Sequence, residues 1–176
     1  NSNDASKLIF LGTFELAAGL HNLTVDIPSP EVCFSDNFTE DSNYMWQPLS
    51  GEWVRENGTL RQLKYSDNVW NVVKGLDLSS FVMNFNLKPD DSNLYGNGMI
   101  FDYINGSTYA LQFNEQPKTA ELWYWNGSDW RRLASSFADI QVQHWYNVKV
   151  IVENNNIKIF LNESKIMDFT DQDTSH

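Results

Sequence analysis

The chain has 176 residues, a length that suits one domain, and 14% of them are aromatic, which is enough for a sizeable core. Its formal net charge of −11 argues against binding nucleic acid or an anionic membrane surface, because both need clusters of Lys and Arg. The single cysteine, Cys33, excludes an internal disulfide, and the three scattered histidines His21, His144 and His176 exclude a Cys/His metal cluster.

The chain begins at Asn1 rather than Met, so we expect a processed mature form or an excised domain. No apolar run approaches the length of a membrane span, and no signal peptide is recognisable. Chance would give about two or three Asn-x-Ser/Thr sequons in such a sequence. The excess favours an exported, glycosylated protein at the cell surface or outside the cell. The six acceptors are Asn22, Asn37, Asn57, Asn105, Asn126 and Asn162.

The first predicted elements lie in residues 7–27, where an apolar run and two alternating stretches indicate a strand, a loop and a second strand. The sequence Pro28-Ser29-Pro30 then ends any pairing, because proline cannot donate to a strand ladder. We therefore predict an N-terminal strand pair with a linker over residues 1–31 and a main domain over residues 32–176.

From Val32 onward the pattern is that of an antiparallel sandwich. Residues 98–125 alternate aromatic and branched side chains with period two, and Asn105-Gly106 and Asn126-Gly127 supply the positive φ of tight hairpin turns. About a dozen short strands follow one another, with turn signals about every eight to twelve residues. The sequence therefore predicts an all-β fold without internal repeats.

The order of these motifs resembles that of the concanavalin A-like jelly rolls of the laminin-G and carbohydrate-binding type, over roughly residues 32–170. The resemblance implies a two-sheet antiparallel jelly-roll β-sandwich, but it specifies function only weakly. The matching segments are Phe34–Phe38, Trp46, Gly51–Val54, Asn57–Leu60, Phe81–Leu87, Gly98–Tyr103, Tyr109–Leu111, Trp145–Val150, Ile157–Asn162 and Asp168–Thr170.

The chain departs from that family at its end, where Asp171–His176 replaces the expected final strand. A sandwich that lacks one strand has an open edge, which natural proteins rarely leave uncovered. We expect the stretch Leu8–Leu11 to fill a sheet edge, either within the molecule or in a neighbour. The second case is strand donation, which leads to self-association in filaments or surface layers. Alternatively, residues 7–27 are the tail of a preceding domain.

The hairpin of residues 121–130 is the most informative candidate site. Trp123 and Trp125 share one face of its first strand, and Leu122 and Tyr124 share the other. If Leu122 and Tyr124 enter the core, two indoles lie outside, about 7 Å apart, and suit stacking on a sugar ring. In the alternative, the two tryptophans are core and Tyr124 is outside.

Two further aromatic residues, Trp130 and Tyr95, complete the carbohydrate-binding set that we predict. The other tryptophans are assigned to packing, and they are Trp46, Trp53, Trp70 and Trp145.

Related glucanases carry a Glu-x-Asp-x-x-Glu run on one strand, and this chain has none. Asp102 and Glu121 are the strand-borne carboxylates that could form a catalytic pair. We expect a non-catalytic domain that binds a glycan or polysaccharide. The alternatives are a self-assembling structural subunit and a diverged glycoside hydrolase.

Jelly rolls of this type often hold a structural calcium ion. Asp36, Asp90 and Asp91 lie in or near predicted loops and carry the hard oxygen atoms that calcium prefers. Their spacing matches no defined calcium loop, so the alternative is an acidic, solvated turn.

Overall fold

The computed structural model describes residues 9–11, 14–15, 23–26, 33–39, 46–63, 70–73, 80–89, 97–104 and 106–173. Within these residues every regular element is a β-strand. The strands are β1 (Ile9–Leu11), β2 (Phe14–Glu15), β3 (Leu23–Asp26), β4 (Cys33–Asp36), β5 (Trp46–Pro48), β6 (Trp53–Glu56), β7 (Thr59–Gln62), β8 (Trp70–Val73), β9 (Phe81–Pro89), β10 (Asn97–Ile104), β11 (Ser107–Asn114), β12 (Thr119–Trp125), β13 (Trp130–Phe137), β14 (Tyr146–Glu153), β15 (Asn156–Leu161) and β16 (Ser164–Thr170).

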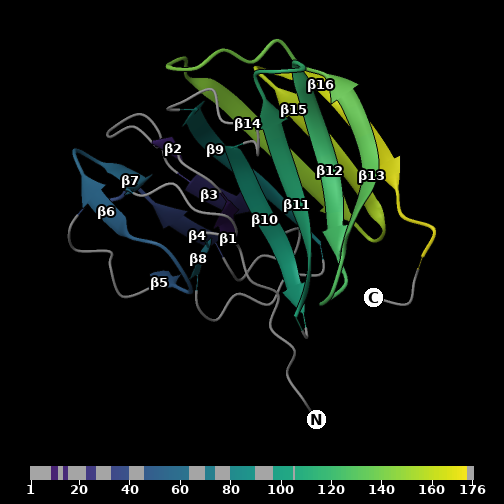
Figure 1. The fold of residues 1–176 in the computed structure, drawn as a ribbon, viewed down its shortest axis with the longest axis horizontal. Helices are drawn as coiled ribbons and strands as arrows, with labels where there is room; N and C mark the ends of the chain where they lie inside the picture. The colour runs from purple at the N-terminus through teal and green to yellow at the C-terminus, as the bar shows by residue number, and fades with distance from the viewer. Residues whose placement is uncertain are drawn as a thin grey trace.

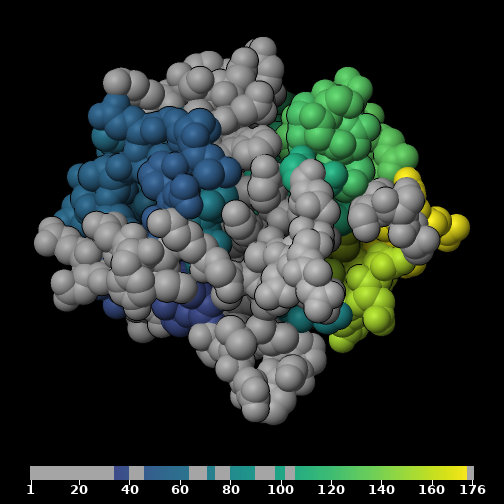
Figure 2. All heavy atoms as spheres, turned by 90° about the horizontal axis from the view of Figure 1, so that it is seen from below, coloured from purple at the N-terminus to yellow at the C-terminus, as the bar shows by residue number. Residues whose placement is uncertain are grey.

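Two antiparallel sheets face each other (Figure 1). The first sheet has the order β13-β12-β11-β10-β1-β8-β5, and the second has the order β16-β15-β14-β9-β3-β4, with β2 also paired to β9. A separate hairpin of β6 and β7 lies at the opposite side of the molecule from β12 and β13 (Figures 1 and 2). The predicted all-β, two-sheet sandwich is therefore confirmed.

The core lies between the two sheets, and the alternation of the strands explains it. In β9, the side chains of Phe81, Met83, Phe85 and Leu87 are buried, while those between them are half-buried on the outer face. The first sheet contributes residues of β10, β11 and β12, and Phe101 meets Phe81 edge to face at 6.2 Å. This contact joins the two layers through aromatic side chains.

The N-terminal strands pair within the chain. β1 lies between β10 and β8, where Ile9 is opposite Ile100 on one side and Val72 on the other. β3 lies between β9 and β4, and it is the partner of the strand that begins the predicted main domain. The stretch Ile9–Leu11 thus pairs with the edges of β10 and β8 in its own molecule. Strand donation to a neighbour, and the division at residue 31, stay predictions.

A hydrogen bond connects the end of the last strand to the first sheet. Asp171 directly follows β16, and its backbone N–H donates to the carbonyl of Asn155 at 2.8 Å. The Tyr109 hydroxyl on β11 donates to the Asp171 carboxylate, also at 2.8 Å, and both residues are buried. This bond connects the two layers through a buried polar contact.

Candidate functional site

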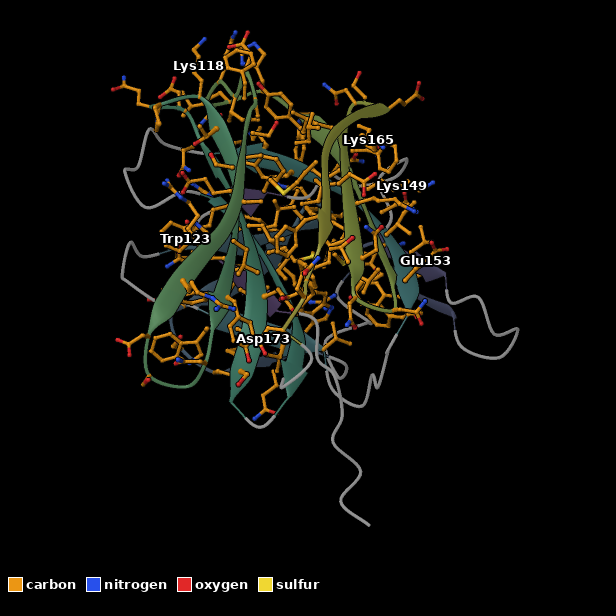
Figure 3. All side chains as sticks on the ribbon, turned by 90° about the vertical axis from the view of Figure 1, so that its right-hand side faces the viewer. Lys118, Trp123, Lys149, Glu153, Lys165 and Asp173 are labelled. Carbon is orange, nitrogen blue, oxygen red and sulfur yellow. The ribbon has the colours of Figure 1, made fainter. Side chains whose placement is uncertain are left out.

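The outward face of β12 carries aromatic side chains. Leu122 and Tyr124 are buried in the core, whereas Trp123 and Trp125 are half-buried on the opposite face of the same strand. Figure 3 shows Trp123 on the side of its sheet that is turned away from the second sheet. Of the two orientations that the sequence left open, the structure therefore has the one with both indoles outside the core.

A β-bulge brings two residues of β13 onto this face. Leu122 is opposite Ala134 but Trp123 is opposite Arg132, so Leu133 is an extra residue in β13. Leu133 and Ala134 both pack against the core. Because a shift of one residue exchanges the two faces of a strand, the bulge places Arg132 beside Trp123 on the outward face.

The bulge also directs Trp130 outward, opposite Trp125. We call the outward side chains of β12 and β13 the aromatic strip. It comprises Thr119, Glu121, Trp123, Trp125, Trp130, Arg132, Ser135 and Phe137.

The indole rings of the strip are held by contacts on one side. The Trp125 and Trp130 rings lie 5.3 Å apart at an angle of 44°. Trp123 and Trp130 pack against a small apolar cluster of Val72, Ile100 and Ala110, each fully buried. The sheet therefore supports these rings on one side, and the half-exposed remainder of each ring is available to a ligand.

A charged pair lies in the middle of the strip. The Glu121 carboxylate accepts a hydrogen bond from the Trp123 indole N–H at 3.0 Å and another from the Arg132 guanidinium at 3.0 Å. The guanidinium carbon of Arg132 is 5.9 Å from the Trp123 ring centroid. The Glu121 side chain is 11% exposed and that of Arg132 is 55% exposed. Arg132 therefore keeps accessible N–H donors, while Glu121 fixes its position.

The turn between β12 and β13 sets the end of the strip. The Asn126 side-chain oxygen accepts from the backbone N–H groups of Ser128 and Asp129, at 2.9 and 2.8 Å. Gly127 has φ of 95°, a value that a glycine adopts without strain. This local hydrogen bonding holds Trp125 and Trp130 at the two sides of a short loop.

The structure places four of the six predicted glycosylation acceptors. Asn37, Asn57, Asn126 and Asn162 are all exposed, as an acceptor must be. The side chains of Asn22 and Asn105 lie outside the described residues. Glycosylation itself stays a prediction.

The remaining aromatic predictions have different outcomes. Tyr95 and the side chain of Trp70 lie outside the described residues. Trp46 is buried and Trp53 is half-buried, in agreement with packing roles. Trp145 is 38% exposed, so its assignment to packing is wrong, and the Lys88 ammonium lies 5.5 Å from its ring centroid. This indole precedes β14 and belongs to the outward face of the second sheet.

The candidate catalytic pair of Asp102 and Glu121 stays a prediction. Glu121 is engaged by Trp123 and Arg132, and the side chain of Asp102 lies outside the described part. In the ranges that the structure describes, no group of three or more His, Cys, Asp and Glu side chains could hold a metal ion. The same ranges contain no helix that is long and apolar enough to span a membrane.

Asp36 is the acceptor of a buried ion pair. Its carboxylate oxygen Oδ2 lies 2.8 Å from the Arg55 guanidinium and also accepts the indole N–H of Trp46 at 2.5 Å. Oδ1 accepts the backbone N–H of Phe38 at 2.7 Å. A guanidinium in direct contact does not fit a calcium site, because its charge would repel the ion. Asp90 and Asp91, the other predicted ligands, lie outside the described residues.

Sequence reasoning missed Arg132 and did not assign Glu121 to a binding site. The signal that could have found Arg132 is the pair Leu133-Ala134, two adjacent apolar residues between the polar pairs Arg131-Arg132 and Ser135-Ser136. Such a pair is typical of a bulge, at which the alternation changes phase.

Two comparisons relate this geometry to known proteins. The model of one protein family, described as a 3-keto-alpha-glucoside-1,2-lyase-like domain, matches residues 35–176. Among solved structures, the carbohydrate binding module CBM66 from Bacillus subtilis is similar, with a TM-score of 0.63 and 18% sequence identity. The match covers 72% of this chain and 80% of that chain. No curated protein sequence matches the chain. The structural likeness supports the jelly-roll fold that the resemblance implied.

Proposed function

Because the chain belongs to the family of 3-keto-alpha-glucoside-1,2-lyase-like domains, we propose that it is a sugar-recognition domain that binds glycans through the aromatic strip. In this proposal the domain acts outside the cell or at its surface and does not transform its ligand. The observation that carries the proposal is the outward position of Trp123 and Trp125, while Leu122 and Tyr124 fill the core. The similarity in fold to a carbohydrate binding module supports it.

The chemistry of the strip suits a neutral sugar. Half-exposed indole rings offer flat apolar surfaces on which the C–H face of a pyranose ring can stack. Arg132, held in place by Glu121, supplies exposed charged donors, and hydrogen bonds to charged groups are stronger than those between neutral groups. The net charge of −11 disfavours an anionic ligand.

The test is electrophoresis of the chain through native gels that contain one neutral polysaccharide each, such as starch, mixed-linkage β-glucan, xylan, galactomannan or levan. We expect retardation in at least one gel. In that gel Trp125→Ala should weaken binding by about tenfold or more, as the loss of a central aromatic contact does elsewhere. The matched control is Trp145→Ala, which removes an exposed indole from the other outward face.

Two results would contradict the proposal. One is free migration of the wild-type chain in every gel together with a glycan array that shows no bound sugar. The other is equal loss of binding in Trp125→Ala and Trp145→Ala, since that outcome would place recognition away from the strip. Circular dichroism of both variants establishes that they are folded.

A second candidate function is lyase activity on a 3-keto-α-glucoside, and the family description favours it. A carbonyl at C3 acidifies the proton at C2, so a base can remove that proton while the C1–O bond breaks and an enone forms. Glu121 is the carboxylate beside the exposed rings and would be the base. Incubation with an aryl 3-keto-α-glucoside tests this. Catalysis is supported if the wild type releases the phenol and Glu121→Gln does not. It is rejected if the wild type releases no phenol.

A further inference from the structure

The aromatic strip is long and narrow, and from this shape we propose that it binds an internal stretch of an extended oligosaccharide chain, laid along β12 and β13. The alternative that this excludes is a site for one terminal sugar ring. The inference rests on the proposed function, and it adds the class and orientation of the ligand.

The strip has aromatic side chains at both ends. On β12 it runs from Thr119 to Trp125, which are seven residues, and the six steps between them span about 20 Å at the usual rise of an antiparallel strand. Trp125 and Trp130 lie at one end. At the other end Phe137 is opposite Thr119 and is 71% exposed. Phe137 thus adds a large, mostly exposed apolar surface at this end of the strip.

Between these ends, aromatic and polar groups follow one another in a line. Trp123 and its neighbour Arg132 come after the paired indoles, and Glu121 with Ser135 comes next, before Phe137. A single pyranose ring covers only a fraction of this length. A chain of several sugars could place one ring on each aromatic surface and its hydroxyl groups on the charged pair between them.

The sides of the strip also favour a linear ligand. The outward residues Ala110 on β11, Ile100 on β10 and Val72 on β8 are fully buried, and Gln112 on β11, opposite Glu121, is half-buried, so little of the described surface beside the strip is open. On the other side, β13 is the last strand of the first sheet. Within the described residues, the accessible surface of this face thus follows the strand direction.

The experiment uses fragments of the polysaccharide that retards the chain, separated by size from one to eight sugar units. Isothermal titration calorimetry should give an affinity that rises by about tenfold or more from the shortest to the longest fragments and then levels off. Phe137→Ala should weaken binding of the longest fragments by about threefold or more and leave the shortest binding fragment unaffected. Leu63→Ala, which removes an exposed apolar side chain beyond the β6–β7 hairpin, is the control.

The results separate this inference from the proposed function. If the single sugar binds as tightly as the longest fragment, or if Phe137→Ala has no effect on any fragment, the strip binds glycans but not as an extended chain. If no polysaccharide binds at all, both proposals fail together. An affinity that rises with length and depends on Phe137 only for long fragments supports the inference.

Discussion

The two outward faces of the sandwich are built on the same strand alternation but carry different chemistry. The first sheet presents the aromatic strip, with its half-buried indoles. The second sheet presents polar groups, and these include Asn84, Asn86, Asn147, Lys149, Lys158, Lys165 and Asp168. Figure 3 shows Trp123 on one side of the molecule and Lys149 and Lys165 on the other.

The polar face shows what the fold requires of an outward surface. There the amide of Asn147 donates to Asn86 at 3.2 Å, and Lys165 pairs with Asp168 at 2.7 Å. Two rings on this face lie beside lysines: the Lys149 ammonium is 6.0 Å from the Phe160 ring centroid, and the Lys88 ammonium is 5.5 Å from that of Trp145. The second sheet thus folds with a largely hydrated face. The indoles of the first sheet are therefore not a requirement of the architecture, and they point to recognition of another molecule.

The largest expected effect concerns the inward side of the strand that carries the strip. Leu122→Ala removes a fully buried side chain, and we expect it to lower the free energy of unfolding by about 2–5 kcal/mol. Urea denaturation followed by fluorescence measures this change. A loss below about 1 kcal/mol would mean that Leu122 is not a core residue, and the assignment of the two faces of β12 would then be reversed.

An effect of intermediate size is expected when one substitution on each outward face is compared for its loss of stability. Trp123→Ala removes a half-buried indole that packs on Ile100 and Ala110, so we expect a loss of about 2 kcal/mol, less than for a fully buried ring. Lys149→Ala on the other face should stay within about 0.5 kcal/mol of the wild type. Equal losses in the same urea titration would show that the two faces contribute alike to stability.

The smallest effect belongs to the polar face and depends on pH. Hydrogen bonds from Lys165 and Asn156 hold the pKa of Asp168 below its usual value of 3.8. A lowered pKa in the folded state stabilises the protein above the pKa of the unfolded chain, and this contribution is lost as the pH falls through the folded value. Asp168→Asn should therefore lower Tm slightly at pH 7.

Scanning calorimetry at a series of pH values checks this prediction. The difference in Tm between the wild type and Asp168→Asn should shrink as the pH is lowered below about 3.8. A difference that grows on acidification would contradict the assigned ion pair.

The fold class could be predicted because each sheet has one buried face. In β9, Phe81, Met83, Phe85 and Leu87 alternate with residues that face outward, and this period of two is visible in the sequence. The Asn-Gly turn after β12 was equally visible, because its left-handed backbone limits which residues occur there.

The candidate site could be predicted only in part. Period two separates Leu122 and Tyr124 from Trp123 and Trp125, but both sets are apolar, so the pattern does not say which set enters the core. The places of Trp130 and Arg132 depend on the bulge in β13, which period-two reasoning does not include. The partner of Asp36 is Arg55, 19 residues away, and a contact at that separation depends on the tertiary structure.

The extra residue in β13 has a consequence for how this surface could diversify. If Leu133 were deleted, the alternation of β13 would become regular and Arg132 would stay opposite Trp123. If one residue were inserted between Arg132 and Leu133 and the bulge were kept, the inserted residue would take that outward place and Arg132 would turn to the inner face. Such an insertion would thus exchange several side chains of the strip in a single event, while the neighbouring strand kept its own set and the residues that hold the layers together stayed the same.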